Sequence, residues 1–143
     1  MQKLNILVVE DNMNKYRNME SALEKCGEDL ITHKRSRNGA LKALLDANKR
    51  NNQMYDLVIL DMQLPLFEVG GPQDILKNGG ATIESEIVRK GYDCLVAFYT
   101  SEDLEQYYYD EDDYVAHIKY DPSVSIDEEV KQMIDKVRLE KEK

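Results

Sequence analysis

The amino-acid sequence predicts an α/β fold: a single domain of three layers, in which a doubly wound, five-stranded parallel sheet lies between two layers of helices. Five short runs rich in leucine and β-branched residues are bounded by polar or glycine-containing segments, as expected of buried strands. Segments with helical spacing separate these runs, and this alternation indicates a parallel sheet. The length of 143 residues suits one domain with one core.

The third expected strand is the centre of this prediction. The strands are expected over about 4–9, 30–33, 55–60, 94–99 and 114–118. In the third, residues 57–60 form an uninterrupted apolar run that ends at Asp61. Ligands of open parallel sheets bind beyond the carboxyl ends of the strands. Asp61 is therefore expected either to cap the following turn or to react.

Helix signals lie between the strands. The first helix is expected to begin at Asn12 or Asn14 and to end at Gly27, and the second to be capped by Ser36 or Asn38. Further helical segments are predicted as a turn at 73–77, a helix over 82–90 that stops at Gly91, a short acidic helix over 102–109 capped by Ser101, and a last helix after a capping-box pattern at 125–128. The charged tail 138–143 is expected to fray.

Composition excludes several classes of protein. The net charge of −9 disfavours sequence-independent phosphate binding, so no nucleic-acid partner is expected. No apolar run approaches the roughly 18 residues that a membrane span needs, and the first residues lack the cleavage site of a signal peptide. Cys26 and Cys94 make no disulfide framework, which favours a reducing compartment. We therefore expect a cytoplasmic protein with no membrane partner.

Charged and hydroxyl side chains follow four of the expected strands. Glu10 and Asp11 follow the first strand, Asp61 the third, Thr100 the fourth and Lys119 the fifth. Right-handed crossovers bring the carboxyl ends of parallel strands to one edge. Each residue alone could be a cap or a solvated charge, but clustered carboxylates repel one another unless a positive charge lies among them. The set therefore favours a site for a divalent cation and phosphate.

In this combination the sequence resembles the receiver domain of two-component response regulators. The resemblance rests on residues 6–12, residues 56–65 with Pro65 four positions after Asp61, residues 99–101, and Lys119. It covers nearly the whole chain and implies a flavodoxin-like (CheY-like) fold over 1–143. The core would span about 4–138, with an extended loop at about 66–80 after the third strand.

The resemblance also implies a role for each site residue. Asp61 would accept a phosphoryl group from a sensor histidine kinase or a histidine phosphotransfer protein. Thr100 would hydrogen-bond the acyl phosphate, and Lys119 would pair with it. Mg²⁺ would be held by Glu10, Asp11, Asp61 and the backbone carbonyl of Gln63. The domain would then be a phosphoacceptor rather than an enzyme that turns over a substrate.

Four features depart from the pattern of the family. The stretch at 67–80, rich in glycine and proline, lengthens the connection after Asp61. Tyr120 follows Lys119 where the family usually has proline, and Ala116 stands at the position of the family's switch aromatic. Tyr114 lies two residues earlier and shares its face. The segment after the fourth strand is unusually acidic, which suggests an unusual partner.

Three functions remain open from the sequence. The leading one is a stand-alone phosphoacceptor receiver domain that signals by protein contact. The second is a receiver-like interaction module that no longer switches on phosphorylation. The third is a Mg²⁺-dependent phosphohydrolase or phosphotransferase. Such enzymes usually carry a second acid two residues after the nucleophile, where this chain has Gln63.

Overall fold

The computed structural model describes residues 2–50, 53–69, 75–107 and 109–143. Its elements are β1 (Asn5–Val9), α1 (Met13–Lys25), β2 (Leu30–Lys34), α2 (Arg37–Lys49), β3 (Leu57–Leu60), β4 (Leu64–Pro65), β5 (Ile75–Leu76), α3 (Gly79–Lys90), β6 (Leu95–Tyr99), β7 (Ala116–Ile118) and α4 (Asp127–Lys141). Two short 3₁₀ helices, Leu104–Tyr107 and Glu111–Asp113, lie between β6 and β7. In the described part of the chain, no helix is long and apolar enough to cross a membrane.

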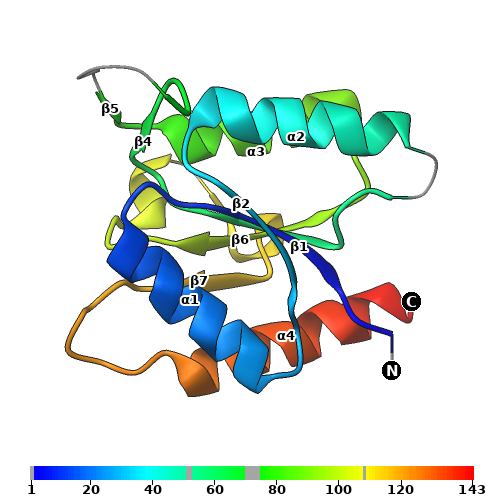
Figure 1. Cartoon of the computed structure of the whole chain (residues 1–143), viewed down its shortest axis with the longest axis vertical. Coiled ribbons are helices and arrows are strands. Elements are labelled where there is room, and N and C mark those ends of the chain that lie inside the picture. Colours follow the sequence, from blue (N-terminus) through cyan, green and yellow to red (C-terminus); the bar gives the residue numbers. More distant parts are fainter. Residues whose placement is uncertain (1, 51–52, 70–74, 108) are drawn as a thin grey trace.

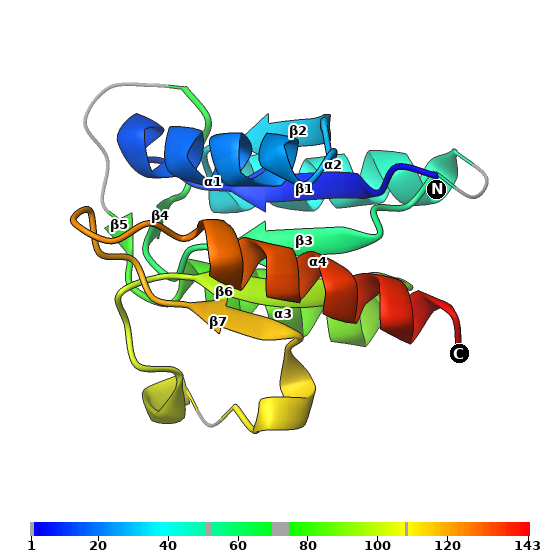
Figure 2. The ribbon, with the colours of Figure 1, turned by 90° about the horizontal axis from the view of Figure 1, so that it is seen from below.

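The main sheet has five parallel strands in the order β2-β1-β3-β6-β7. Helices α2 and α3 cover one face, and α1 and α4 cover the other (Figure 1). The strands end at the edge where β4 and β5 lie, and both chain termini lie at the opposite edge (Figures 1 and 2). The predicted three-layer, flavodoxin-like architecture is confirmed.

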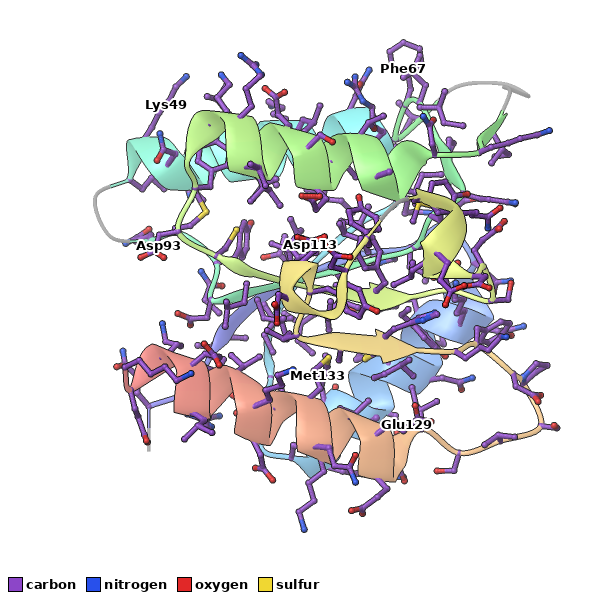
Figure 3. All side chains as sticks on the ribbon, turned by 180° about the vertical axis from the view of Figure 1, so that it is seen from behind. Lys49, Phe67, Asp93, Asp113, Glu129 and Met133 are labelled. Atoms are coloured by element: carbon purple, nitrogen blue, oxygen red, sulfur yellow. The ribbon has the colours of Figure 1, made fainter. Side chains whose placement is uncertain are left out.

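The two faces of the sheet bury separate apolar cores because side chains alternate along each strand. In β1, Ile6 and Val8 pack against α1 and α4, whereas Leu7 and Val9 pack against α2 and α3. Met133 points from α4 toward the sheet (Figure 3). Full burial of such a side chain contributes about 1.5–3 kcal/mol. The same alternation decides which side chains meet beyond the strand ends.

The caps of the first two helices agree with the sequence. Asn12 caps α1 by accepting a hydrogen bond from the Lys15 amide, with the oxygen and nitrogen 3.1 Å apart. Ser36 caps α2 by accepting one from the Gly39 amide at 2.9 Å. Gly27, with φ +81°, follows α1 in the left-handed conformation that glycine adopts at no steric cost. These signals fix the directions in which α1 and α2 leave the carboxyl edge.

The helix expected over 102–109 is wrong. Within this range, Leu104–Tyr107 form a 3₁₀ helix in which Leu104 is buried, and Tyr108 lies outside the described residues. The hydroxyl of Thr100, rather than that of Ser101, accepts the Glu102 amide hydrogen at 3.2 Å. Among the described residues, the α-helices are therefore α1, α2, α3 and α4, and none of them lies between β6 and β7.

The connection after Asp61 also differs from the prediction. The helical turn expected at 73–77 is wrong for Ile75–Leu76, which pair with Leu64–Pro65 as a two-stranded antiparallel sheet. Residues 73 and 74 of the expected turn lie outside the described residues. The α3 helix begins at Gly79, earlier than the expected residue 82. Phe67 projects outward from this connection with 54% of its surface exposed (Figure 3).

The predictions for the last helix are partly wrong. Its N-cap is Ile126, which makes no capping hydrogen bond with its side chain, so the expected capping box is absent. The Ser125 hydroxyl accepts the Asp127 amide hydrogen at 3.3 Å instead. The tail does not fray at 138–141, because Arg138 pairs with Glu28 and Lys141 pairs with Asp56. These ion pairs join the end of α4 to the amino edge of the sheet.

Candidate functional site

The register of the sheet brings the expected site residues to its carboxyl edge. Glu10 and Asp61 directly follow β1 and β3, and the Asp61 amide donates to the Val9 carbonyl at 3.1 Å. Thr100 and Lys119 directly follow β6 and β7, whose last residues are also in register. The pairs β1–β3 and β3–β6 are aligned in the same way. Four neighbouring strands thus carry two acids, a hydroxyl and an ammonium to one place.

The two acids share the ammonium of Lys15, which comes from the first turn of α1. Its Nζ lies 2.9 Å from Oε1 of Glu10 and 3.1 Å from Oδ1 of Asp61. Glu10 and Asp61 have the same alternation as Val8 and Ile59, so they face α1 rather than α2. The side chains of Lys15 and Glu10 are 6% and 2% exposed, whereas 14% of the Asp61 side chain is exposed. Asp61 is therefore the member of this trio that solvent reaches best.

Aromatic rings complete the surroundings of Lys15. Its Nζ lies 5.0 Å from the ring centroid of Tyr99 and 5.2 Å from that of Tyr120. The two rings pack edge to face, with centroids 5.7 Å apart. Ring faces attract a cation, and the attraction grows when water is excluded. Tyr120, which directly follows Lys119, thus contributes to holding the ammonium.

Burial dominates the electrostatics of Glu10. Loss of solvent raises the pKa of its carboxyl above the ordinary 4.5, the charge of Asp61 raises it further, and Lys15 opposes both effects. The Oε2 atom also accepts the Asn12 amide hydrogen at 3.2 Å. A single ammonium therefore compensates only part of the repulsion between two converging acids.

Asp11 and Gln63 have other partners. The Asp11 carboxylate lies 3.4 Å from the Arg35 guanidinium, and both side chains are nearly half exposed. The Gln63 side-chain amide donates to Glu102 at 2.7 Å. Asp11 alternates with Glu10 and so faces the side of α2, where Arg35 precedes the helix. The structure therefore separates Asp11 from the Glu10–Asp61 pair.

Thr100 and Lys119 differ in exposure. Thr100 is 1% exposed, whereas Lys119 is exposed and, among the described residues, forms no ion pair. The Tyr120 amide donates to the Thr100 carbonyl at 3.3 Å, which ties the ends of β6 and β7 together. A free ammonium and a buried hydroxyl thus flank the acidic pair.

Close packing of α3 fixes the main chain of Asp61. The Gly80 amide donates to the Met62 carbonyl at 3.0 Å. A Cβ atom at Gly80 would lie 2.2 Å from the Asp61 carbonyl oxygen, which is closer than any real contact. The Asp61 carboxylate also accepts the Met62 amide hydrogen at 2.7 Å. Backbone contacts therefore hold the acid in place before any ligand binds.

The sequence did not lead us to place the side chains of Lys15, Tyr99 and Tyr120 in the site. A signal for Lys15 was present, because it lies four residues before Met19 and seven before Ala22 on the inward face of α1. A charged residue at such a position must find a buried partner. The two tyrosines carried no comparable signal, since their contact with Lys15 depends on how β6 and the β7–α4 connection meet.

The described arrangement does not fit the divalent cation that the resemblance implies. The Lys15 ammonium lies between the carboxylates of Glu10 and Asp61, and Asp11 pairs with Arg35 instead of joining them. Over the described ranges, no group of three or more acidic, histidine or cysteine side chains is arranged to hold a metal ion. Mg²⁺ requires oxygen ligands at 2.0–2.1 Å in near-octahedral geometry, which an ammonium between two of them prevents.

No protein-family model matches the chain, and no curated protein matches its sequence. Solved structures do match. The response regulator TrrA of Thermotoga maritima, in complex with Mg²⁺-BeF, has a TM-score of 0.67 at 24% identity, over 96% of this chain and 99% of that one. A phosphorylated cyanobacterial phytochrome response regulator, RcpA, has a TM-score of 0.68 at 19% identity, over 98% and 96% of the two chains.

A CheY-like receiver domain protein from Methanospirillum hungatei extends the comparison, with a TM-score of 0.65 at 17% identity over 97% of this chain and 99% of that chain. Each match covers nearly the whole of both chains. The chain has the fold of response regulator receiver domains.

Proposed function

We propose that this protein is a phosphoacceptor receiver domain of a phosphorelay. Asp61 accepts a phosphoryl group from a phosphohistidine on a sensor histidine kinase or histidine phosphotransfer protein, and the modified domain signals by binding another protein. The observation that carries the proposal is the partly exposed Asp61 carboxylate at the end of the central strand, 3.1 Å from a cation. Thr100 and Lys119 follow the neighbouring strands in a receiver fold.

The proposed transfer needs little chemistry from the protein. An Asp61 oxygen bonds to phosphorus while the phosphorus–nitrogen bond of the phosphohistidine breaks. The ring nitrogen keeps the bonding electrons and leaves as neutral imidazole, because the other ring nitrogen carries a proton. Catalysis is then positioning and charge compensation. Lys119 pairs with the new phosphoryl oxygens, and the Thr100 hydroxyl exchanges its contact with the Glu102 amide for one of them.

Mg²⁺ remains part of the proposal only for a rearranged site. Glu10, Asp11, Asp61 and the Gln63 carbonyl would hold the ion once Lys15 has moved aside, and the ion would offset negative charge beside Asp61. The complex of TrrA with Mg²⁺-BeF supports this assignment by analogy of fold.

Incubation with a small acyl phosphate, followed by intact-mass measurement, tests the proposal. We expect the wild-type protein to gain the mass of one phosphoryl group and Asp61→Asn to gain none. Asp135→Asn is the matched control, because it removes the same charge from an exposed position on α4. A wild-type protein that gains no mass would overturn the proposal.

Sustained phosphoester hydrolysis is not part of this function. A receiver-like hydrolase needs a proton donor near Asp61, and Gln63, whose amide donates to Glu102, cannot exchange a proton in this role. We expect no turnover of a generic phosphomonoester, whereas hydrolysis that Asp61→Asn abolishes would revive the enzyme hypothesis.

Two observations favour a second function, a receiver-like interaction module that does not switch. The Lys15 ammonium already compensates Asp61, and Ala116 stands where an aromatic switch residue would. In the acyl phosphate experiment, absence of an adduct on Asp61 would overturn the phosphoacceptor function and leave this module as the supported one.

A further inference from the structure

Lys15 is the one buried lysine among the described residues, with 5% of its surface exposed. Removing an ammonium from water costs several kcal/mol unless charged partners compensate it. Lys15 has two such partners, Glu10 and Asp61, and the ring faces of Tyr99 and Tyr120. These four contacts together compensate the buried charge of Lys15 and hold its ammonium in one place.

The backbone of Lys15 is fixed as firmly as its side chain. Its amide donates to the Asn12 cap, and the adjacent Tyr16 ring stacks on His33 with the centroids 3.6 Å apart. The His33 ring in turn contacts the Glu10 carbonyl at 2.7 Å. These contacts hold the first turn of α1 against β1 and β2, so the ammonium is aimed at the acidic pair.

We propose that Lys15 is the resident counter-ion of the Glu10–Asp61 pair, and that a divalent cation binds this pair only by displacing the Lys15 ammonium. This inference rests on the proposed function in one respect: if Asp61 is the phosphoacceptor, Lys15 determines which cation lies beside it. Its test needs no phosphoryl group. The exchange is reversible and breaks no covalent bond, since one cation replaces another beside the same two oxygens.

The first test compares Mg²⁺ affinity in Lys15→Met and wild type. Methionine keeps an unbranched, apolar chain of similar length and a good helix propensity. Affinity is measured by calorimetry and by the Mg²⁺ dependence of thermal unfolding. We expect Mg²⁺ to bind Lys15→Met about tenfold more tightly than wild type or better, within the usual range of coupling between sites. Equal affinities in the two proteins would overturn the proposal.

Lys25→Met is the matched control, because it removes the same charge from the same helix. The Lys25 side chain is 63% exposed and pairs with Asp127, away from the acidic pair. We expect its Mg²⁺ affinity to equal that of wild type. A gain as large as that of Lys15→Met would mean that net charge alone sets the affinity, and would overturn the proposal.

The double variant Glu10→Gln/Lys15→Met locates the site and guards against a folding failure. It removes one acid along with the ammonium, so the repulsion that endangers Lys15→Met is relieved. We expect it to fold and to lose the gain in Mg²⁺ affinity. A double variant that keeps the whole gain would place the ion elsewhere and overturn the proposal.

A wild-type measurement keeps the proposal testable even if the single variant does not fold. With isotope-labelled lysine, the Lys15 ammonium should show slow hydrogen exchange without metal and fast exchange at saturating Mg²⁺. Binding of Mg²⁺ next to Asp61 with Lys15 still protected would overturn the proposal. Failure of the proposed function can be told apart from failure of this inference. In the first case Asp61 forms no phosphoryl adduct, but Mg²⁺ still competes with the Lys15 ammonium.

Discussion

At the scale of single residues, the chemistry of Asp61 depends on the cation that it shares with Glu10. The Lys15 ammonium contacts Asp61 and the more deeply buried Glu10, so neither carboxylate has a cation to itself. A buried acid whose partner is shared keeps a raised pKa, which is the direction found for Glu10. Asp61 is the better solvated of the two, which is consistent with the proposal that Asp61, rather than Glu10, accepts a phosphoryl group.

Glu84 on α3 allows a test of buried acids away from this site. Burial raises the pKa of its carboxyl above 4.5, Asp113 adds to this effect, and a hydrogen bond from the Tyr109 hydroxyl opposes it. A raised folded-state pKa favours the protonated form in the folded protein. The stabilisation is thus complete below pH 4.5 and is lost as the pH rises through the folded-state value.

We therefore expect wild type to lose stability relative to Glu84→Gln as the pH rises from 4.5. Urea unfolding of both proteins over a series of pH values measures this difference. The glutamine keeps the shape and an acceptor for Tyr109 but does not titrate. Parallel stability curves for the two proteins would contradict the assignment.

At the scale of elements, the start of α3 sets the position of Asp61. Gly80 has no Cβ, and the Asp61 carbonyl occupies the place that a Cβ would take. The contact is with backbone, so no side chain can rotate to relieve it. Overpacking of this kind typically costs 1–3 kcal/mol.

We expect Gly80→Ala to lower the free energy of unfolding by about 1–3 kcal/mol and to shift the amide signals of Asp61 and Met62. Ser85→Ala, at an exposed position of the same helix, should change stability by less than about 0.5 kcal/mol. Urea unfolding and amide spectra of both variants provide the measurement. A Gly80→Ala protein with unchanged Asp61 signals would contradict the packing argument.

The elements that the sequence predicted well are those with strong local signals. The apolar runs located five strands, and Asn12, Ser36, Gly27 and Gly91 marked the ends of three helices. The predictions failed where tertiary contacts decide the conformation. Ile75–Leu76 form a strand because they pair with β4. Helix α4 extends to Lys141 because the side chain of this residue forms an ion pair with Asp56 at the amino edge. For the site, the strand ends and the inward position of Lys15 on α1 could be predicted, but the partners of the Lys15 ammonium could not, because they come from other elements.

At the scale of the whole molecule, the amino edge of the sheet is closed by an ion pair between distant parts of the chain. Glu28, with a side chain 1% exposed, pairs with Arg138 of α4 and accepts the Leu4 amide hydrogen at 2.8 Å. Arg138 also donates to the Gln2 carbonyl at 3.0 Å. This pair joins the α1–β2 turn, the approach to β1 and the last helix. The start of β1 and the end of α4 lie at the edge of the sheet opposite the carboxyl ends of the strands (Figure 2).

Arg138→Met should therefore destabilise the whole domain. It leaves the buried Glu28 carboxylate without its cation, and removal of one partner of a buried pair costs about 3–5 kcal/mol. Lys143→Met breaks the exposed pair with Glu140 in the same helix and should cost less than about 1 kcal/mol. Urea unfolding measures both. Similar losses of unfolding free energy in the two variants would show that Glu28 is solvated. A large loss in Arg138→Met alone, with unchanged Mg²⁺ affinity, would show that the amino edge stabilises the domain independently of the Glu10–Asp61 pair.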